Sequence, residues 1–417
     1  MNMYSKCMLR ARYLFMVIPG VLYWCVASNW WLLDIAGIGT DENFIDLSWF
    51  YSYVECVQSL SDIFLFTSTG CSTANNYGPV TTILFWLIVK SGAPIYMVGI
   101  FMMVAITATL IYLCLKLGRS SLLARTYQLL LILCPGMILL FERGNLDGVI
   151  FLGLTIIIFG LYGKRPSLSL VLLVILSLIK FYTIFLVVFL ILIEKSSRGK
   201  KLTKIIFSLS PVLFFAILIV DKIPYNWFLS FGSFMPLAYV DFALKEFGST
   251  PKIIEFLIAQ IEVRIFLGVI ISFLIFMFFY RFVTIYKILI KEIFEISINS
   301  KIVSSSDIYF IGVSIVFISC YFLSTNYDYR MVFLVPSLIM LDKKVSGKIS
   351  QNFFLTFLAI STLWLGSVYS GPRYFLQAAQ FLGDISANLV VGVLVVYIIG
   401  CPNLSVFSSL NRALRNR

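Results

Sequence analysis

Residues 167–193 read SLSLVLLVILSLIKFYTIFLVVFLILI, a run of twenty-seven residues with a single charge, Lys180, at its middle. A transmembrane helix needs only about 20 apolar residues. A lysine inside such a run must reach the interface, pair with an acid or face an aqueous cavity. The run therefore indicates a membrane protein and makes Lys180 a candidate functional residue.

The whole chain has the composition of an integral membrane protein. Of its 417 residues 60% are hydrophobic and 12% are charged, and the mean hydropathy is +0.97, whereas a soluble domain is about one quarter charged. No hydrophilic stretch is long enough for a soluble catalytic domain. The absence of histidine excludes imidazole as a base or metal ligand, so acid–base chemistry falls to the twenty carboxylates. There is no Walker loop and no strand–GxGxxG–helix unit, which argues against a nucleotide-activated substrate.

The distribution of charge predicts the orientation in the membrane. Basic residues precede the first apolar run, so we expect 1–33 to be the first transmembrane helix, with the N-terminus in the cytoplasm. The loop 34–77 has six carboxylates and no Lys or Arg, and we expect it outside, together with a second loop at 221–262. Basic clusters are typical of cytoplasmic segments; here they lie at 195–204, 287–301, 343–348 and 412–417. The net charge of +12 is first a topological signal and second a sign of an anionic lipid or ligand.

Two apolar runs do not fit a single crossing. Residues 78–90 would form a helix about 20 Å long, too short for a hydrocarbon core of roughly 30 Å, and 167–193 contains Lys180. If every run crosses once, 20 basic residues fall inside and 11 outside. If 78–90 re-enters and 167–193 folds back at Lys180, the numbers become 23 and 8, and Arg143 joins the acidic loop outside. We prefer the second arrangement.

The fold class follows from the remaining runs. They lie near 94–115, 126–141, 147–163, 203–220, 264–290, 308–324, 331–341, 352–369 and 386–400. The chain is predicted to be one integral membrane domain, 1–417, an all-α polytopic transmembrane helical bundle of about 10–12 membrane segments.

The eight cysteines are scattered and form no CxxC pair, so we expect no zinc site. Six lie in or beside apolar runs and are interpreted as small core residues. The spacing of Cys56 and Cys71 permits a disulfide if their loop is periplasmic.

Charged residues inside or beside apolar runs are functional candidates by default. The acidic loop holds three acids within six residues, Asp41, Glu42 and Asp46, directly after the first span. Between two apolar runs lies Arg143-Gly144-Asn145-Leu146-Asp147, which is more polar than a tight turn requires. For the loop acids the alternative is a solvated loop that orients the protein, and for the Arg143 segment an ordinary turn.

Two further segments qualify. Lys180-Phe181-Tyr182 places a cation where it would face a phosphate; the alternative is a pairing with Asp147 or another acid that serves packing alone. The segment Asn326-Tyr327-Asp328-Tyr329-Arg330 combines an amide, an acid and a guanidinium with two tyrosines, a set able to bind a sugar and an anion. In the alternative, Asp328 and Arg330 pair across a turn, among aromatic residues of an interfacial belt.

The ordered set of these motifs resembles the polytopic C-type glycosyltransferases. Over about residues 46–340 the chain matches, in order, an aspartate-led aromatic segment from Asp46, an Asn-Tyr-Pro-like helix start at Asn76-Tyr77, and an Arg-Gly-Asn-x-Asp turn at Arg143. A Lys-aromatic-Tyr-Pro at Lys180 and an Asn-Tyr-Asp-Tyr-Arg at Asn326 follow. Gly78 and Thr183 replace prolines of the family pattern. The small size is similar to that of the serotype-converting glucosyltransferases of temperate bacteriophages, which add a side-branch sugar to lipopolysaccharide O-antigen.

The resemblance implies an inverting transfer at the outer face of a bacterial inner membrane. A hexose would move from a polyprenyl-phosphate sugar to a glycan or lipid-linked acceptor, with Asp46 as base and Asp41 or Glu42 as alternatives. Substrate-binding residues would be Arg143, Asn145, Asp147, Lys180, Asn326, Asp328 and Arg330. The implied partners are the lipid-linked donor, the acceptor and membrane lipids, not nucleic acid; no cofactor is implied, and a divalent cation stays open. The alternatives are a polysaccharide polymerase and a transporter or lipid flippase.

Asp46 is preferred on physical grounds. Leu47, Phe50, Tyr51 and Val54 have helical apolar spacing, so Asp46 would open a helix, whose N-terminus favours a carboxylate. A base on such an element is better positioned than one at a mobile loop tip.

Overall fold

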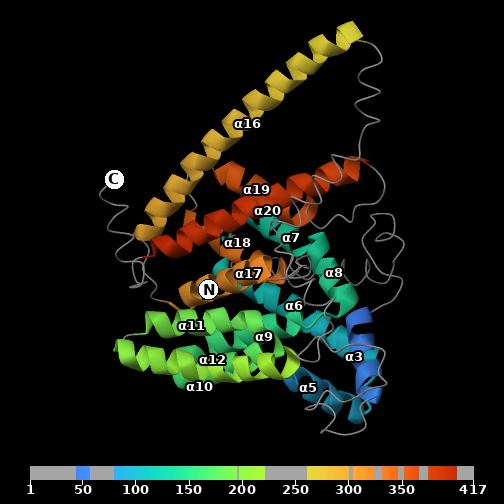
Figure 1. Ribbon diagram of the computed structural model, residues 1–417, viewed down its shortest axis with the longest axis vertical. Coiled ribbons are helices and arrows are strands. Elements are labelled where there is room, and N and C mark those ends of the chain that lie inside the picture. Colours follow the sequence, from blue (N-terminus) through green and yellow to red (C-terminus); the bar gives the residue numbers. More distant parts are fainter. Residues whose placement is uncertain are drawn as a thin grey trace, which may run out of the picture.

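The computed structural model describes residues 44–56, 79–194, 197–220, 261–299, 304–323, 331–345, 352–365 and 374–401. Within these residues all regular structure is helical, which confirms the all-α expectation (Figure 1). The expected first transmembrane helix at 1–33, most of the loop 34–77, and residues 221–260 of the second loop lie outside the described residues.

The helices of the first half follow the predicted apolar runs. They are α3 (Ile45–Cys56), α5 (Pro79–Lys90), α6 (Ile95–Leu117), α7 (Leu122–Ile132), α8 (Pro135–Arg143), α9 (Asp147–Ile156), the π-helix η1 (Ile157–Tyr162), α10 (Pro166–Ile179), the 3₁₀-helix η2 (Phe181–Thr183), α11 (Ile184–Ile193) and α12 (Arg198–Val220). The second half contains α16 (Ile261–Ile298), α17 (Ser305–Leu323), α18 (Met331–Val345), α19 (Asn352–Leu365) and α20 (Tyr374–Gly400).

Two described helices are individually long and apolar enough to cross a membrane. They are α6, with 23 residues and a mean hydropathy of 2.4, and residues Ser305–Phe322 of α17, with a mean hydropathy of 1.5. The pair α7 and α8 would make a third span if its two bent halves count as one. The described part of the chain therefore has two or three candidate spans.

The predicted run 126–141 is not one straight helix, which corrects the sequence-based expectation. The chain bends by 48° between α7 and α8. Pro135 begins α8, and Cys134 before it is extended at φ −68° and ψ 152°. Proline cannot donate a backbone hydrogen bond and excludes the helical conformation from the preceding residue, so the helix must stop and restart here.

The run 167–193 is broken at Lys180, as predicted. α10 ends at Ile179, Lys180 is extended at φ −142° and ψ 122°, and the short η2 leads into α11. α10 and α11 pack against each other, and α12 packs against both (Figure 1). The two halves of the run therefore form a hairpin with Lys180 at its tip.

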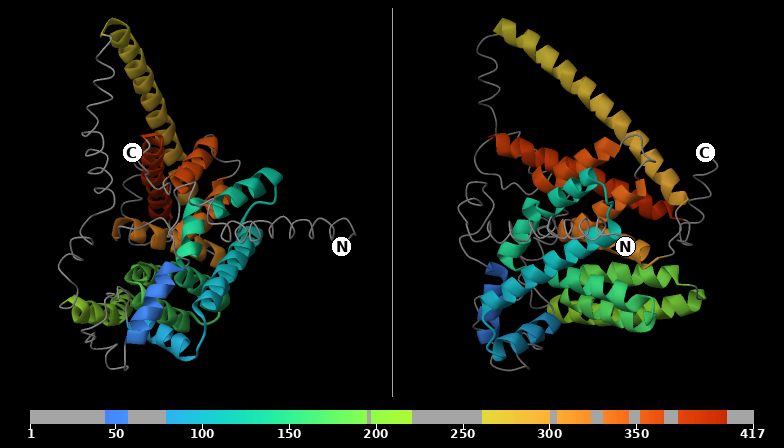
Figure 2. Two further views of the ribbon diagram at one scale, coloured as in Figure 1. Left: turned by 90° about the vertical axis from the view of Figure 1, so that its right-hand side faces the viewer. Right: turned by 180° about the vertical axis from the view of Figure 1, so that it is seen from behind.

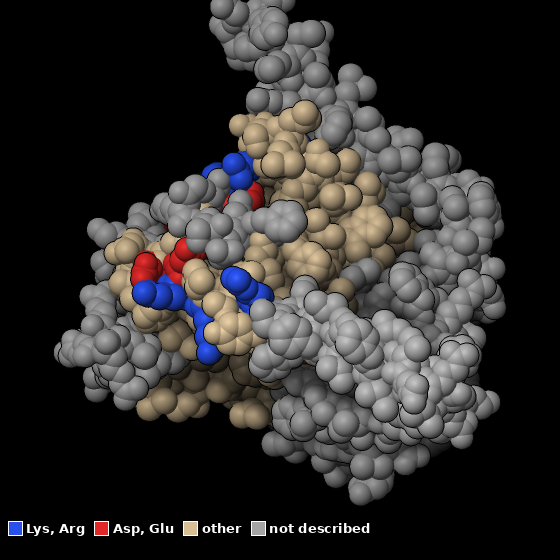
Figure 3. Space-filling view, turned by 90° about the horizontal axis from the view of Figure 1, so that it is seen from above, with Lys and Arg blue, Asp and Glu red and all other residues tan. Residues whose placement is uncertain are grey.

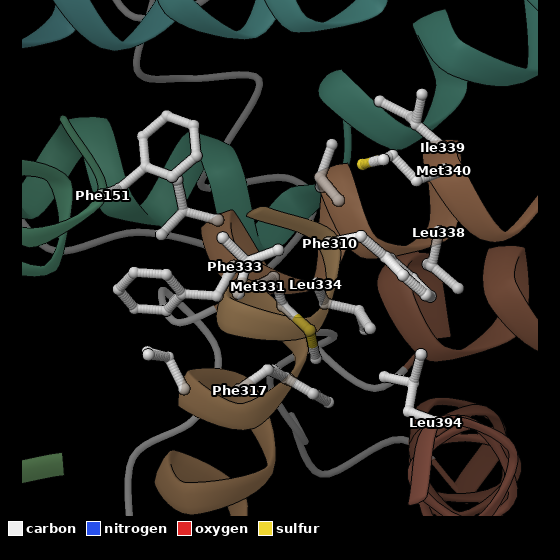
Figure 4. Close-up of a cluster of buried hydrophobic side chains, with 14 of the residues drawn as sticks. Phe151, Phe310, Phe317, Met331, Phe333, Leu334, Leu338, Ile339, Met340 and Leu394 are labelled. Carbon is white, nitrogen blue, oxygen red and sulfur yellow. The ribbon is translucent and has the colours of Figure 1, made fainter. Parts of the chain in front are cut away.

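The main core forms around α18. Thirteen of its fifteen residues are buried, so α18 lies inside the protein. Figure 4 shows the side chains that surround it, including Phe151 from α9, Phe310 and Phe317 from α17, and Leu394 from α20. Four cysteines are buried as expected, namely Cys114, Cys134, Cys320 and Cys401; Cys7, Cys25 and Cys71 lie outside the described residues.

Several helix ends meet at one end of the bundle. Lys344 at the end of α18 pairs with Asp307 at the start of α17, at 2.6 Å, and Arg119 after α6 lies 3.5 Å from Asp342. Gly163, which follows η1, lies beside Ser305 at this end. α9 and η1 together lead from Asp147 to this point, so Asp147 lies about 24 Å away, the length of that helix. Figure 3 shows Lys, Arg, Asp and Glu side chains grouped toward one side of the described surface.

Candidate functional site

Asp46 is the second residue of α3 and lies in its first turn, as the apolar spacing predicted. Leu47 and Val54 are buried, with relative exposures of 0% and 1%, and Asp46 itself is 6% exposed. α3 packs against α5, α6 and α8 (Figure 2). Asp46 therefore lies on a helix that packs against three other helices.

Two glycines let the start of α3 approach its neighbours. A Cβ added at Gly99 of α6 would lie 2.6 Å from the Phe44 ring, and one at Gly144 would lie 2.7 Å from the Leu47 side chain. Both distances are too short for real atoms. Phe44 itself has a left-handed backbone, at φ 57°, a conformation that persists only where surrounding structure enforces it.

The segment 143–147 is a sharp turn between α8 and α9. Gly144 is left-handed at φ 61°, its N–H bonds to Phe141 O, and the N–H of Asn145 bonds to Leu140 O. This is the Schellman arrangement that ends a helix at a glycine. The Asn145 side-chain oxygen then accepts the N–H of Asp147 at 2.9 Å, which starts α9.

Asp46 receives three hydrogen bonds from this turn. Arg143 donates to its Oδ1 from Nε at 3.0 Å and from Nη2 at 2.7 Å. Asn145 Nδ2 donates to its Oδ2 at 2.5 Å. A carboxylate that only accepts, from a guanidinium and an amide, is bonded as its ionised form requires. Residues 97 and 99 positions apart in the chain thus meet.

Lys180 enters the same network from the tip of the α10–α11 hairpin. Its Nζ donates to Asp147 Oδ1 at 2.7 Å and to Asn145 Oδ1 at 3.3 Å. Tyr182, which is buried, also donates to Asp147 Oδ1. Asn145 therefore joins the two ion pairs, with its amide nitrogen on Asp46 and its oxygen on Lys180.

The residues of the network differ in exposure and carry charges of both signs. The side chains of Arg143 and Asp46 are 23% and 7% exposed, and those of Lys180 and Asp147 are 11% and 0% exposed. Among the described residues of the network, two acids pair with two bases. That Lys180 faces a phosphate stays a prediction. In the structure Lys180 pairs with an acid, Asp147, and Arg143 pairs with Asp46, because a buried charge without a counter-charge is costly.

Part of the predicted site lies outside the described residues. This applies to Asp41, Glu42, Asn326, Asp328 and Arg330. Of the three basic residues expected to bind substrate, Arg143 and Lys180 are described, and both lie beside Asn145; their contact with a phosphate stays a prediction. In the described part of the chain no group of three or more Cys, Asp or Glu residues is arranged to hold a metal ion.

Sequence reasoning assigned no role to two tyrosines of the site. Tyr182 orients Asp147, and its position two residues after Lys180 was the available signal. Tyr51 donates from its hydroxyl to Ala93 O at 2.8 Å, which ties α3 to the turn before α6. Burial raises the pKa of Tyr51, so the hydroxyl stays protonated and able to donate.

Comparisons of the chain with family models, with curated proteins and with solved structures found no match.

Proposed function

We propose that the protein is an inverting membrane glycosyltransferase with Asp46 as its base. It would move a hexose from a polyprenyl-phosphate sugar to a glycan or lipid-linked acceptor, such as O-antigen, at the outer face of a bacterial inner membrane. The observation that supports this best is the network in which Asp46 from the acidic loop meets Arg143, Asn145, Asp147 and Lys180.

The contact between Asp46 and Arg143 also supports the proposed polytopic orientation. Three apolar runs separate the two residues, so a single crossing by each run would place them on opposite sides of the membrane. Their atoms are 2.7 Å apart, so at least one of the runs does not cross. α5, with twelve residues and a length of about 18 Å, is the shortest of them. This favours an arrangement in which 78–90 re-enters and Arg143 lies on the same side of the membrane as the acidic loop. In the proposed orientation, which rests on the charge distribution, that side is outside and the N-terminus is cytoplasmic.

The proposed reaction consists of one proton transfer and one displacement at the anomeric carbon. Asp46 takes the proton of the acceptor hydroxyl while the oxygen attacks the anomeric carbon, and the bond from that carbon to the phosphate oxygen breaks. A positioned base of this kind contributes about 10² to 10⁴ in rate. The departing polyprenyl phosphate needs a cation, because negative charge grows on it in the transition state.

Arg143 is the cation that a phosphate reaches first. It is the most exposed member of the network. Because Arg143 already binds Asp46, the phosphate would share Arg143 with that carboxylate or draw on Arg330. If Arg143 turned from Asp46 to the phosphate, it would also leave the Asp46 carboxylate free to act as the base.

The experiment compares Asp46→Asn with the neighbouring acids in proteoliposomes. Transfer of radiolabelled sugar from polyprenyl-phosphate hexoses to a panel of glycan acceptors is measured for each variant. We expect Asp46→Asn to abolish transfer, because the amide keeps the shape but not the basicity, while donor binding persists. Asp41→Asn and Glu42→Gln should keep measurable turnover, and Glu194→Gln, which alters the ion pair with Lys204, serves as the control at a distance. If Asp46→Asn is active and Asp41→Asn is inactive, the base is Asp41 and not Asp46. If the wild type transfers no sugar, the protein is not the proposed glycosyltransferase.

One observation favours a second candidate, a transporter or lipid flippase. Two interrupted helical segments, at Gly144 and at Lys180, face each other through the ion pair of Lys180 and Asp147. Broken helices with paired charges are typical of transport sites. In the same liposomes, movement of the lipid-linked sugar across the bilayer without transfer to an acceptor would support this candidate.

A further inference from the structure

The helices α10, α11 and α12 bring basic side chains together at the end of the hairpin opposite Lys180. α10 is about 21 Å long, and η2 with α11 is also about 21 Å long, so the start of α10 lies level with the end of α11. α12 begins at the same end, because Lys201 donates to Leu192 O at 2.7 Å and Lys204 pairs with Glu194 at 2.6 Å (Figure 1).

Five basic residues on the two adjoining turns form what we call the basic end. They are Lys164, Arg165, Lys200, Lys201 and Lys204. Glu194 binds Lys204 through both carboxylate oxygens. Lys164, Arg165 and Lys200 are exposed, and no ion pair joins any of these three to another described residue. The described part of the basic end therefore has an excess of positive charge.

The positions of these charges are unfavourable for the protein by itself. Both α10 and α12 begin at the basic end, and neither has an acidic residue in its first turn. The N-terminus of a helix carries a partial positive charge, so nearby lysine and arginine side chains are destabilising and an anion is stabilising. The arrangement therefore favours an anion from outside the chain.

Exposed apolar side chains follow the basic end along the same two helices. On α12 Ile206 is 59% and Phe207 is 80% exposed, and on α10 Val171 is 56% and Ile175 is 40% exposed. Phe207 is two turns, about 10 Å, after Lys200 and lies on the same side of α12. α10 and α12 also pack against each other. A ligand that matches both features has an anionic group and an apolar chain.

We propose that the basic end binds the headgroup of an anionic glycerophospholipid, such as phosphatidylglycerol, with its acyl chains along the exposed faces of α10 and α12. The phosphodiester accepts hydrogen bonds from lysine and arginine. In the proposed orientation this end is cytoplasmic, and anionic lipids of the cytoplasmic leaflet attract basic segments next to the membrane. The basic end is separated from Lys180 by the length of α10, about 21 Å, so this binding does not depend on the proposed transfer of sugar.

The test measures binding of phosphatidylglycerol to the purified full-length protein in a non-ionic detergent. Native mass spectrometry counts the bound lipids and gives their affinity, and phosphatidylcholine with the same acyl chains is the comparison. We expect the wild type to bind phosphatidylglycerol about tenfold or more tightly than phosphatidylcholine. Lys164→Gln and Lys200→Gln should each weaken the binding of phosphatidylglycerol about fivefold, and Lys200→Arg, which keeps the charge, should bind like the wild type.

The matched controls are Lys287→Gln and Lys291→Gln. Both lysines are exposed on α16, which continues with Glu292 and Glu295, and each control removes one positive charge from the same protein. We expect both controls to bind phosphatidylglycerol like the wild type. Because the measurement uses folded protein in detergent, it is independent of the effect of a lysine on membrane insertion. If either Lys164→Gln or Lys200→Gln is not recovered in folded form, the other gives the same comparison from a separate turn.

Three results would overturn the proposal. The first is equal affinity of the wild type for phosphatidylglycerol and phosphatidylcholine, and the second is unchanged affinity for phosphatidylglycerol in both Lys164→Gln and Lys200→Gln. The third is an equal loss in Lys287→Gln, which would show that only the net charge of the protein attracts the lipid. Glycerol 3-phosphate, which lacks acyl chains, should displace the lipid only at large excess; binding as tight as that of phosphatidylglycerol would show a site for a small anion instead of a lipid.

Discussion

Replacing Lys180 by methionine tests whether the buried ion pair is real. Methionine has a similar length but no charge, so the substitution leaves Asp147 as a carboxylate with 0% exposure and without its cation at 2.7 Å. Removal of one partner of a buried pair costs about 3–5 kcal/mol, because the remaining charge is uncompensated. Lys180 is only 11% exposed, so water replaces little of the lost contact. We therefore expect Lys180→Met to lower the free energy of unfolding by most of that amount.

The double variant Lys180→Met, Asp147→Asn separates loss of charge from loss of packing. Its amide oxygen can still accept the hydrogen bond from Tyr182, and no buried charge remains. Since replacing both partners of a polar pair is close to neutral, the double variant should be more stable than Lys180→Met by about 2 kcal/mol or more.

Unfolding of the purified protein in mild detergent, followed by tryptophan fluorescence, gives these free energies. The control is Lys204→Met, which breaks a pair with Glu194 of similar length, 2.6 Å, whose side chains are 42% and 38% exposed. Exposed pairs contribute about 0–1 kcal/mol. A Lys180→Met protein as stable as Lys204→Met, or a double variant no more stable than the single one, would refute the pairing of Lys180 with Asp147.

Two other predictions concern the turn and the orientation. Gly144→Ala should destabilise the protein by about 1–3 kcal/mol and reduce any transfer activity, because φ is 61° and the added Cβ would lie 2.7 Å from Leu47; thermal unfolding of the variant measures the cost. A cysteine at position 62 should react with a membrane-impermeant thiol reagent added from outside, and one at position 198 should not; the reverse pattern would contradict the predicted orientation.

The helices were predictable because hydropathy and helix-breaking residues act locally. Apolar runs mark α6 and α17, and Lys180 marks the break in the longest run. The central place of α18 was not predictable in the same way. A helix that is apolar on all sides looks the same in sequence whether it faces lipid or protein, and the run 331–341 gave no signal that α18 would be enclosed by α9, α17 and α20.

The candidate site was predictable for a related reason, and only in part. In a chain with so few charges, each charge next to an apolar run must find a partner, so Asp46, Arg143, Asp147 and Lys180 stood out by position alone. The choice of partner did not follow, because Asp147 and a lipid phosphate satisfy Lys180 equally well by charge. In the structure the carboxylates of Asp46 and Asp147 are the partners, and the two ion pairs form around Asn145. If the proposed function is right, a donor phosphate competes with groups already paired, so its binding would require Arg143 to turn away from Asp46.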